Sequence, residues 1–197
     1  MPYILSEKIR KVQNLFNLKI IFWVIFYTGL LIGSINISKI DIYFENFSVN
    51  MMNFKNILLL LKIIIREMQI IILLLLSSFS ILGVLTSFLF VFLKGLGLGI
   101  ILSQLYTHYL FKGIVFGMFV FLPGAFVSSM SLVNFASESF KFSLEITKKM
   151  LPCSNEENLW ILLKPYTRKL SKFLFLSSMG AIITIMLGCI FSKFFNF

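Results

Sequence analysis

Charged residues are scarce in this sequence, and the side chains that most enzymes use are scarcer still. Of the 197 residues, 13% are charged and 58% are hydrophobic, and there is one histidine, whereas an ordinary soluble domain carries roughly a quarter charged residues. A water-soluble fold could not bury this much apolar surface. The long uncharged runs instead predict a chain that crosses a bilayer whose hydrocarbon core is about 30 Å thick.

The sequence also lacks the residue sets that catalysis and cofactor binding need. His108 is a lone imidazole in a predicted external turn, and it is interpreted as an interfacial polar residue rather than a ligand or base. Cys153 and Cys189 fall on opposite sides of the membrane, which excludes a disulfide between them. No G-x-x-x-x-G-K-[ST] motif occurs, so nucleotide-driven work would require another subunit. We expect no catalytic residue, cofactor or metal, and hence no enzyme.

The hydrophobic runs predict an all-α, polytopic membrane protein that forms one membrane domain over residues 1–197. Lys55, Lys62 and Arg66 fall near one helical face and predict an amphipathic interfacial helix over residues 52–67. Residues 134–172 are the most polar part and predict a cytoplasmic loop, in which Pro165 ends a short helix. The five predicted spans are 20–37, 68–92, 95–111, 113–133 and 173–191.

Two of these spans have a second interpretation. The basic residues ahead of residue 20 would also suit a secretory signal peptide, but no A-x-A cleavage site follows, which favours an uncleaved helix. The glycine-rich segment 95–111 is short, and it is either a thin membrane span or a re-entrant loop.

The basic residues indicate an orientation. The net charge is +10, and the basic residues that produce it lie at the ends of apolar segments. This placement fits anchoring in a membrane rather than nucleic-acid binding. With five crossings, twelve Lys and Arg residues lie on the side of the amino terminus and six on the other side. Because basic residues accumulate in cytoplasmic loops, the sequence predicts a cytoplasmic amino terminus and an external carboxyl terminus.

Small residues in the predicted spans indicate close helix packing. Two G-x-x-x-G patterns, Gly95 with Gly99 and Gly113 with Gly117, predict helix contacts within the chain, and they leave oligomerisation open. Pro123-Gly124 predicts a kink whose unpaired carbonyl neighbouring helices or Ser128 must satisfy. Serines in the second, third and fourth spans favour packing over the lining of a path, and no predicted span carries an ionisable group.

Residues 89–131 resemble the stage II sporulation protein M family. The resemblance rests on Phe92-Leu93-Lys94-Gly95, then Lys112-Gly113, and then Phe121-Leu122-Pro123, in the order and spacing of that family. Many relatives carry a polar residue after the proline and a glutamate near the position of Ser128, and this chain departs from them with Gly124 and Ser128.

The resemblance implies a membrane scaffold of endospore formation. In that family the protein recruits peptidoglycan hydrolases to the septum for engulfment of the forespore, so the expected partners are membrane lipid, other septal proteins and cell-wall hydrolases. The external segments 38–67 and 107–112 are the predicted contact sites. The alternative is a permease or channel subunit that works with a separate ATPase, suggested by the Pro123-Gly124 kink and the serines.

Overall fold

The computed structural model describes residues 2–35, 57–80, 82–150 and 159–191, and all of its regular structure there is helical. The all-α prediction is therefore confirmed for the described residues. The elements in chain order are α1 (Pro2–Ile35), α3 (Ile57–Ser78), α4 (Gly83–Phe116), the π-helix η2 (Gly117–Phe121), α5 (Leu122–Met150) and α6 (Leu159–Phe191).

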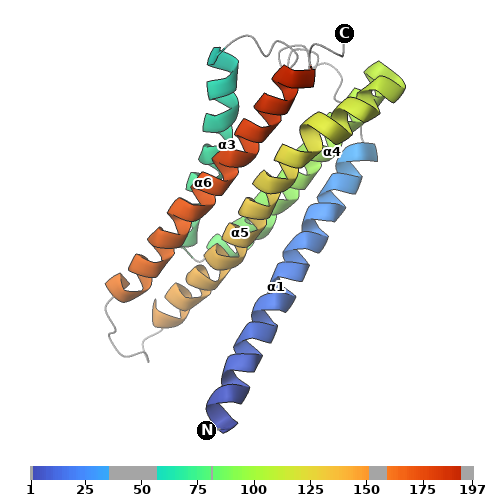
Figure 1. Cartoon of the computed structure of the whole chain (residues 1–197). Coiled ribbons are helices and arrows are strands. Elements are labelled where there is room, and N and C mark those ends of the chain that lie inside the picture. The colour runs from blue at the N-terminus through green and yellow to red at the C-terminus, as the bar shows by residue number, and fades with distance from the viewer. Residues whose placement is uncertain (1, 36–56, 81, 151–158, 192–197) are drawn as a thin grey trace.

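The long helices lie side by side as an up-and-down bundle (Figure 1). Helices α4 and α5 form its middle, with α1 along one side and α6 along the other, and α3 lies close to α6. The beginning of α1 and the beginning of α6 are at one end of the bundle, and their last turns are at the opposite end.

Within the described residues, four helices are long and apolar enough to cross a membrane. These segments are Asn17–Ile35, Gly83–Thr107, Tyr109–Thr147 and Tyr166–Gly188. Most of their large apolar side chains on the outer faces remain exposed in the isolated chain, for example Leu31, Leu85 and Met186. Exposed apolar faces of this extent are those of helices that lipid surrounds.

The prediction of one span over 68–92 is wrong, and the boundary expected at residue 67 between an interfacial helix and that span is absent, while residues 52–56 of the predicted interfacial helix lie outside the described residues. Helix α3 runs through the expected boundary and ends at Ser78, and the chain then reverses direction before α4 begins at Gly83. The turn is closed by the Ser80 N–H, which donates to the Ser77 carbonyl, and by the Gly83 N–H, which donates to the Ser80 carbonyl. Polar serines and a glycine at a turn stop the helix in the middle of an otherwise apolar run.

The prediction of separate spans ending at 92 and beginning at 95 is also wrong, because α4 continues through Lys94. The predicted reversal near residues 107–112 is present, at Leu110, whose backbone has φ 48° and ψ −126°. A positive φ at a leucine costs of order 1–3 kcal/mol. Residues on both sides of Leu110 pack against each other, since a methyl group on Gly113 would overlap the Leu105 carbonyl.

Residues 134–150 and 159–172 are helical rather than a loop, which corrects the prediction for 134–172. Helix α5 buries Phe135, Ser139, Phe142 and Ile146 at spacings of three and four residues, so its charged residues are those of one helical face. Helix α6 runs through Pro165. Residues 151–158, which include the expected beginning of the short helix that ends at Pro165, lie outside the described residues.

The predicted kink at Pro123 takes the form of a π-helix. Proline has no N–H for the helix ladder, and the N–H of the preceding Leu122 donates to the Gly117 carbonyl at the wide spacing of a π-turn. The Ser128 hydroxyl donates to the Ala125 carbonyl, 3.1 Å away, so it does not offset the proline as predicted.

An aromatic cluster joins three helices in the core. Phe22 of α1 stacks on Phe88 of α4 at a centroid distance of 4.9 Å, and Phe88 meets Phe140 of α5 edge to face at 5.4 Å. Offset and edge-to-face pairs add about 1 kcal/mol each to the burial of the rings. The cluster fixes α1 against the α4–α5 hairpin.

Candidate functional site

Helices α1 and α4 meet along a glycine seam, made of Gly29 and Gly33 on α1 and Gly95 and Gly99 on α4. A methyl group on Gly29 would overlap the Phe92 carbonyl, and one on Gly33 would overlap the Leu96 carbonyl. On the other side, Gly95 and Gly99 lie against the Phe26 and Leu30 carbonyls in the same way. Two backbones can approach this closely only where both helices carry glycine.

The other predicted glycines make contacts elsewhere in the bundle. Gly113 and Gly117 follow the reversal at Leu110 and pack against Leu105 and Leu102 of α4. Gly124 lies against Gly180 and Thr184 of α6, where a side chain would overlap the Gly180 carbonyl, while Pro123 is exposed. Sequence reasoning missed Gly29, Gly33 and Gly180, although Gly29 and Gly33 have the same spacing as the pairs it did use.

Lys94 and Glu67 form an ion pair between α4 and α3. The Lys94 side chain is 10% exposed and the Glu67 side chain 21% exposed. Glu67 is eleven residues before Ser78, where α3 ends, and Lys94 is eleven residues after Gly83, where α4 begins. Eleven residues span about 16 Å along a helix axis. If the turn lies at the edge of a hydrocarbon core of about 30 Å, the ion pair lies near the bilayer midplane.

This pair corrects two predictions, that residue 94 lies between the spans 68–92 and 95–111, and that no span carries an ionisable group. The apolar segment Gly83–Thr107 includes Lys94 close to its centre. A lone ammonium at that depth would be costly, but a carboxylate at the same depth on the neighbouring helix neutralises it. Ionisable residues inside a membrane domain mark functional sites by default, and this makes the pair the first candidate.

A second polar group of residues, the hydroxyl seam, surrounds the α3–α4 turn. Thr86 of α4 donates to the Ser77 hydroxyl of α3 at 2.8 Å. The Ser143 hydroxyl of α5 donates to the Ser80 carbonyl at 2.7 Å, and the Tyr166 hydroxyl of α6 donates to the Ser78 hydroxyl at 3.0 Å. The seam therefore consists of Ser77, Ser78, Ser80, Thr86, Ser143 and Tyr166, and it ties three helices to one turn.

Tyr166 is the central side chain of the hydroxyl seam. Only 4% of it is exposed, and its ring stacks on Phe142 at 4.2 Å with an interplanar angle of 2°. Phe135 stacks on it at 5.7 Å. A buried phenol needs a partner for its hydroxyl, and Ser78 provides it. Sequence reasoning assigned Tyr166 to a loop and so missed it.

Two buried serines deeper in the bundle also donate hydrogen bonds to backbone carbonyls of a neighbouring helix. Ser103 of α4 donates to the Ser34 carbonyl of α1 at 3.0 Å, and Ser131 of α5 donates to the Phe173 carbonyl of α6 at 2.7 Å. Among the described residues, the Ser129 hydroxyl and the Lys141 ammonium are the buried side-chain groups without a hydrogen-bond partner. Several interior hydroxyls therefore join helices, while those of Ser128, Ser137 and Thr184 bond carbonyls of their own helix. Both uses are the packing roles that the sequence analysis favoured.

The part of the chain that the structure describes contains no cluster of side chains that could bind a metal ion. No group of three His, Cys, Asp or Glu residues occurs within those ranges. The backbone of His108 lies in α4 and that of Cys189 in α6, with their side chains outside the described residues, and Cys153 is also outside them.

Comparisons of the chain with protein-family models, with curated proteins and with solved structures give no match. The resemblance of residues 89–131 to the stage II sporulation protein M family therefore remains a prediction from the quoted residues. The geometry adds that Lys94 and Gly95, both in the quoted motif, face α3 and α1 respectively.

Proposed function

We propose that this chain is a multi-pass protein of the bacterial cytoplasmic membrane that acts as a scaffold of endospore formation, positioning peptidoglycan hydrolases at the septum for engulfment. The proposal includes five crossings, by α1, α3, α4, α5 and α6. Helix α3 is on average as apolar as α4, but it carries three charged residues, Lys62, Arg66 and Glu67. Glu67 is paired with Lys94 of α4, which offsets its charge.

The distribution of basic residues supports the proposed orientation. The end of the bundle with the beginnings of α1 and α6 carries eleven of the twelve residues assigned to the cytoplasmic side, because only Lys94 lies at mid-depth. The positive-inside rule therefore supports a cytoplasmic location for this end. The reversal at Leu110 then lies outside, together with the exposed Phe111 and Lys112.

The observation that carries the scaffold proposal is the use of interior polar groups in bonds between helices. A permeation path needs polar groups that face water or a solute, whereas Ser103, Ser131 and Tyr166 each bond a neighbouring helix. Such a bundle favours one fixed conformation. A scaffold needs a fixed shape and exposed ends on which partners assemble.

The test uses photo-crosslinking from the external tip in sporulating cells of the encoding organism. A photo-reactive residue at Phe111, which is 77% exposed, reports on the tip, and one at Ile182, 38% exposed on α6, is the matched control in the span. We expect a cell-wall hydrolase or another septal protein to crosslink from position 111 and not from 182. Recovery of neither kind of protein from position 111 would overturn the proposal.

A permease or channel subunit is the second candidate, and the mid-depth ion pair favours it. Ion-coupled carriers use carboxylates and ammoniums at this depth to bind and release ions. Flux of ions or small solutes into proteoliposomes, measured for the unmodified chain and for Glu67→Gln, tests this candidate. Flux that disappears in Glu67→Gln would favour transport over scaffolding, and absence of flux for every solute would remove the candidate.

A further inference from the structure

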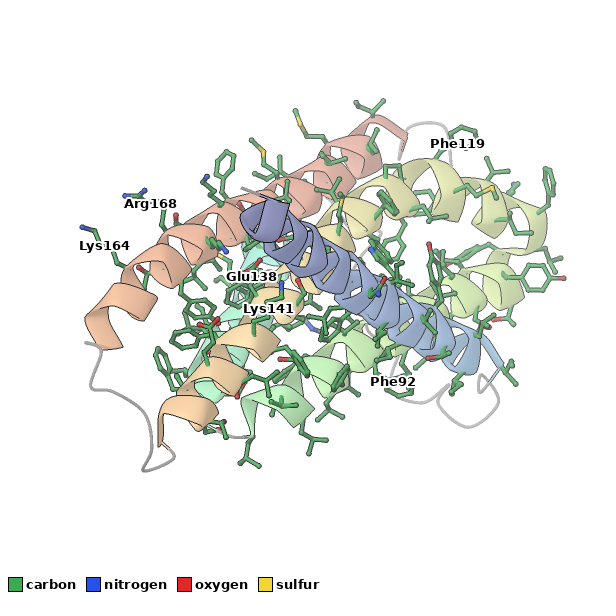
Figure 2. All side chains as sticks on the ribbon, turned by 90° about the horizontal axis from the view of Figure 1, so that it is seen from below. Phe92, Phe119, Glu138, Lys141, Lys164 and Arg168 are labelled. Atoms are coloured by element: carbon green, nitrogen blue, oxygen red, sulfur yellow. The ribbon has the colours of Figure 1, made fainter. Side chains whose placement is uncertain are left out.

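Helix α6 carries a row of exposed cations near the beginning of its apolar segment. Lys164, Arg168 and Lys172 are spaced four residues apart, and all three are exposed. Residues at this spacing lie on one helical face. Figure 2 shows Lys164 and Arg168 projecting away from the rest of the bundle at this end.

The hydroxyl seam places this row at the edge of the hydrocarbon core. Tyr166 bonds Ser78 at the α3–α4 turn, and both Gly83, at that turn, and Tyr166 begin apolar segments long enough to cross a membrane. Lys164 and Arg168 are two residues before and after Tyr166, so they lie at the depth of the lipid headgroups. Lys172 is about one and a half turns deeper, and a long flexible stem allows its ammonium to reach the same level.

The charges at this end are not balanced among the described residues. Lys169 donates to Glu138 at 2.8 Å, whereas Lys141 has no hydrogen-bond acceptor there. Lys19 of α1 and Lys169 lie close enough to Lys141 to act on it electrostatically, with Glu138 and Glu145 as the opposing carboxylates. Among the described side chains, six cations thus face two carboxylates, and this excess of positive charge favours the binding of anions.

We propose that the row Lys164, Arg168 and Lys172 binds the phosphate headgroups of anionic phospholipids in the leaflet at this end, and that the neighbouring unpaired Lys141 adds to the attraction. A phosphodiester at this depth is present in every anionic lipid, and it accepts hydrogen bonds from both Lys and Arg. The inference goes beyond the scaffold proposal. It requires that the bundle lies in a membrane, and it holds equally for a scaffold and a transporter.

The experiment measures lipid binding by the full-length chain in detergent, using native mass spectrometry. Dioleoyl phosphatidylglycerol is titrated against dioleoyl phosphatidylcholine for the unmodified chain and for the triple variant Lys164→Gln, Arg168→Gln, Lys172→Gln. Each removed charge is expected to weaken phosphatidylglycerol binding about fivefold, equivalent to about 1 kcal/mol. The triple variant should therefore lose on the order of 100-fold, and phosphatidylcholine binding should not change.

Lys112→Gln is the matched control, because Lys112 is an exposed lysine at the other end of the bundle. It should retain the phosphatidylglycerol affinity of the unmodified chain. If the triple variant does not purify as a helical, monodisperse protein, Arg168→Gln alone decides through its fivefold loss. The charge-preserving variant Lys164→Arg should keep full affinity.

Three results would overturn the inference. The first is equal binding of phosphatidylglycerol and phosphatidylcholine, which would indicate that the row contacts an acidic protein surface or solvent instead of anionic lipid. The second is an unchanged affinity in the triple variant or in Arg168→Gln. The third is displacement of phosphatidylglycerol by an excess of inorganic phosphate, which would identify a site for the free anion rather than for a lipid headgroup.

Discussion

The glycine seam and the hydroxyl seam hold the same bundle together by different means. Along the glycine seam, α1 and α4 approach until backbone meets backbone, and Ser103 provides a hydroxyl bond between these two helices. Around the α3–α4 turn, Thr86, Ser143 and Tyr166 each donate across a helix boundary. In lipid both devices work, because close packing and interhelical hydrogen bonds replace the hydrophobic drive that water would supply.

The difference teaches which changes each region tolerates. The glycine seam depends on the lack of side chains at its glycines, so a side chain added at one of them separates α1 from α4 along the whole contact. A hydrogen-bonded seam depends on single polar atoms, each of modest value, so one deletion leaves the rest in place. Substitutions can therefore rank the two regions.

The largest effect is expected from Gly95→Val in the glycine seam. A side chain there would overlap the Phe26 carbonyl, and α1 would have to separate from α4, with a loss of about 3 kcal/mol in the free energy of unfolding. Gly97→Ala is the matched control, because it lies on the same helix in open space. It should stabilise the chain by about 0.5–1 kcal/mol through helix propensity. Titration with SDS, followed by circular dichroism, measures both, and equal effects would contradict the seam.

The next effect concerns the ion pair that joins α3 to α4 at mid-depth, about 16 Å from the α3–α4 turn. Lys94→Met leaves the Glu67 carboxylate without its partner, and breaking a buried pair costs about 3–5 kcal/mol. Glu67 is 21% exposed, so we expect about 2 kcal/mol, because water that penetrates the bilayer beside an unpaired charge relieves part of its cost. The double variant Glu67→Met, Lys94→Met should recover most of this loss in the same titration. A double variant no more stable than Lys94→Met would argue against a paired charge.

Much of the bundle could be predicted from the sequence because lipid imposes a simple rule on long apolar runs. The helical class and the reversal near Leu110 follow from that rule and from short polar breaks. The end of α3 at Ser78 and the continuation of α4 through Lys94 could not be found, because the two predicted spans were separated at Lys94. Its neutralising partner Glu67 is 27 residues away in sequence, and only the tertiary structure brings the two side chains together.

The glycine and hydroxyl seams differ in predictability for a related reason. The G-x-x-x-G spacing is local, so Gly95 and Gly99 could be identified as packing residues, while their partner helix could not. Tyr166 was assigned to a loop because the charges around it resemble a solvated segment. Its burial depends on Phe142 and Ser78, which only the folded chain brings to it.

The hydroxyl seam is tested directly by Tyr166→Phe, with an intermediate effect. The variant keeps the stacking on Phe142 and removes the bond to Ser78. Ser78 still donates to the Leu75 carbonyl at 2.6 Å, so no donor is left unsatisfied and the loss should be about 1 kcal/mol. Thermal unfolding in detergent measures it, and Thr167→Val, at an exposed position next to Tyr166, is the control. A loss in Tyr166→Phe no larger than in the control would remove Tyr166 from the seam.

The smallest effect is expected from Ser103→Ala, which removes a hydroxyl bond from the helix pair that glycines hold. Its hydrogen bond to the Ser34 carbonyl spans α4 and α1 at 3.0 Å, and bonds of this kind between membrane helices average about 0.6 kcal/mol. The loss should be smaller than that of Tyr166→Phe, because backbone contact at Gly95 and Gly99 remains in place. SDS titration of the two variants side by side gives the order. The reverse order would mean that α1 is held by this bond rather than by glycine packing, and the distinction between the two seams would no longer stand.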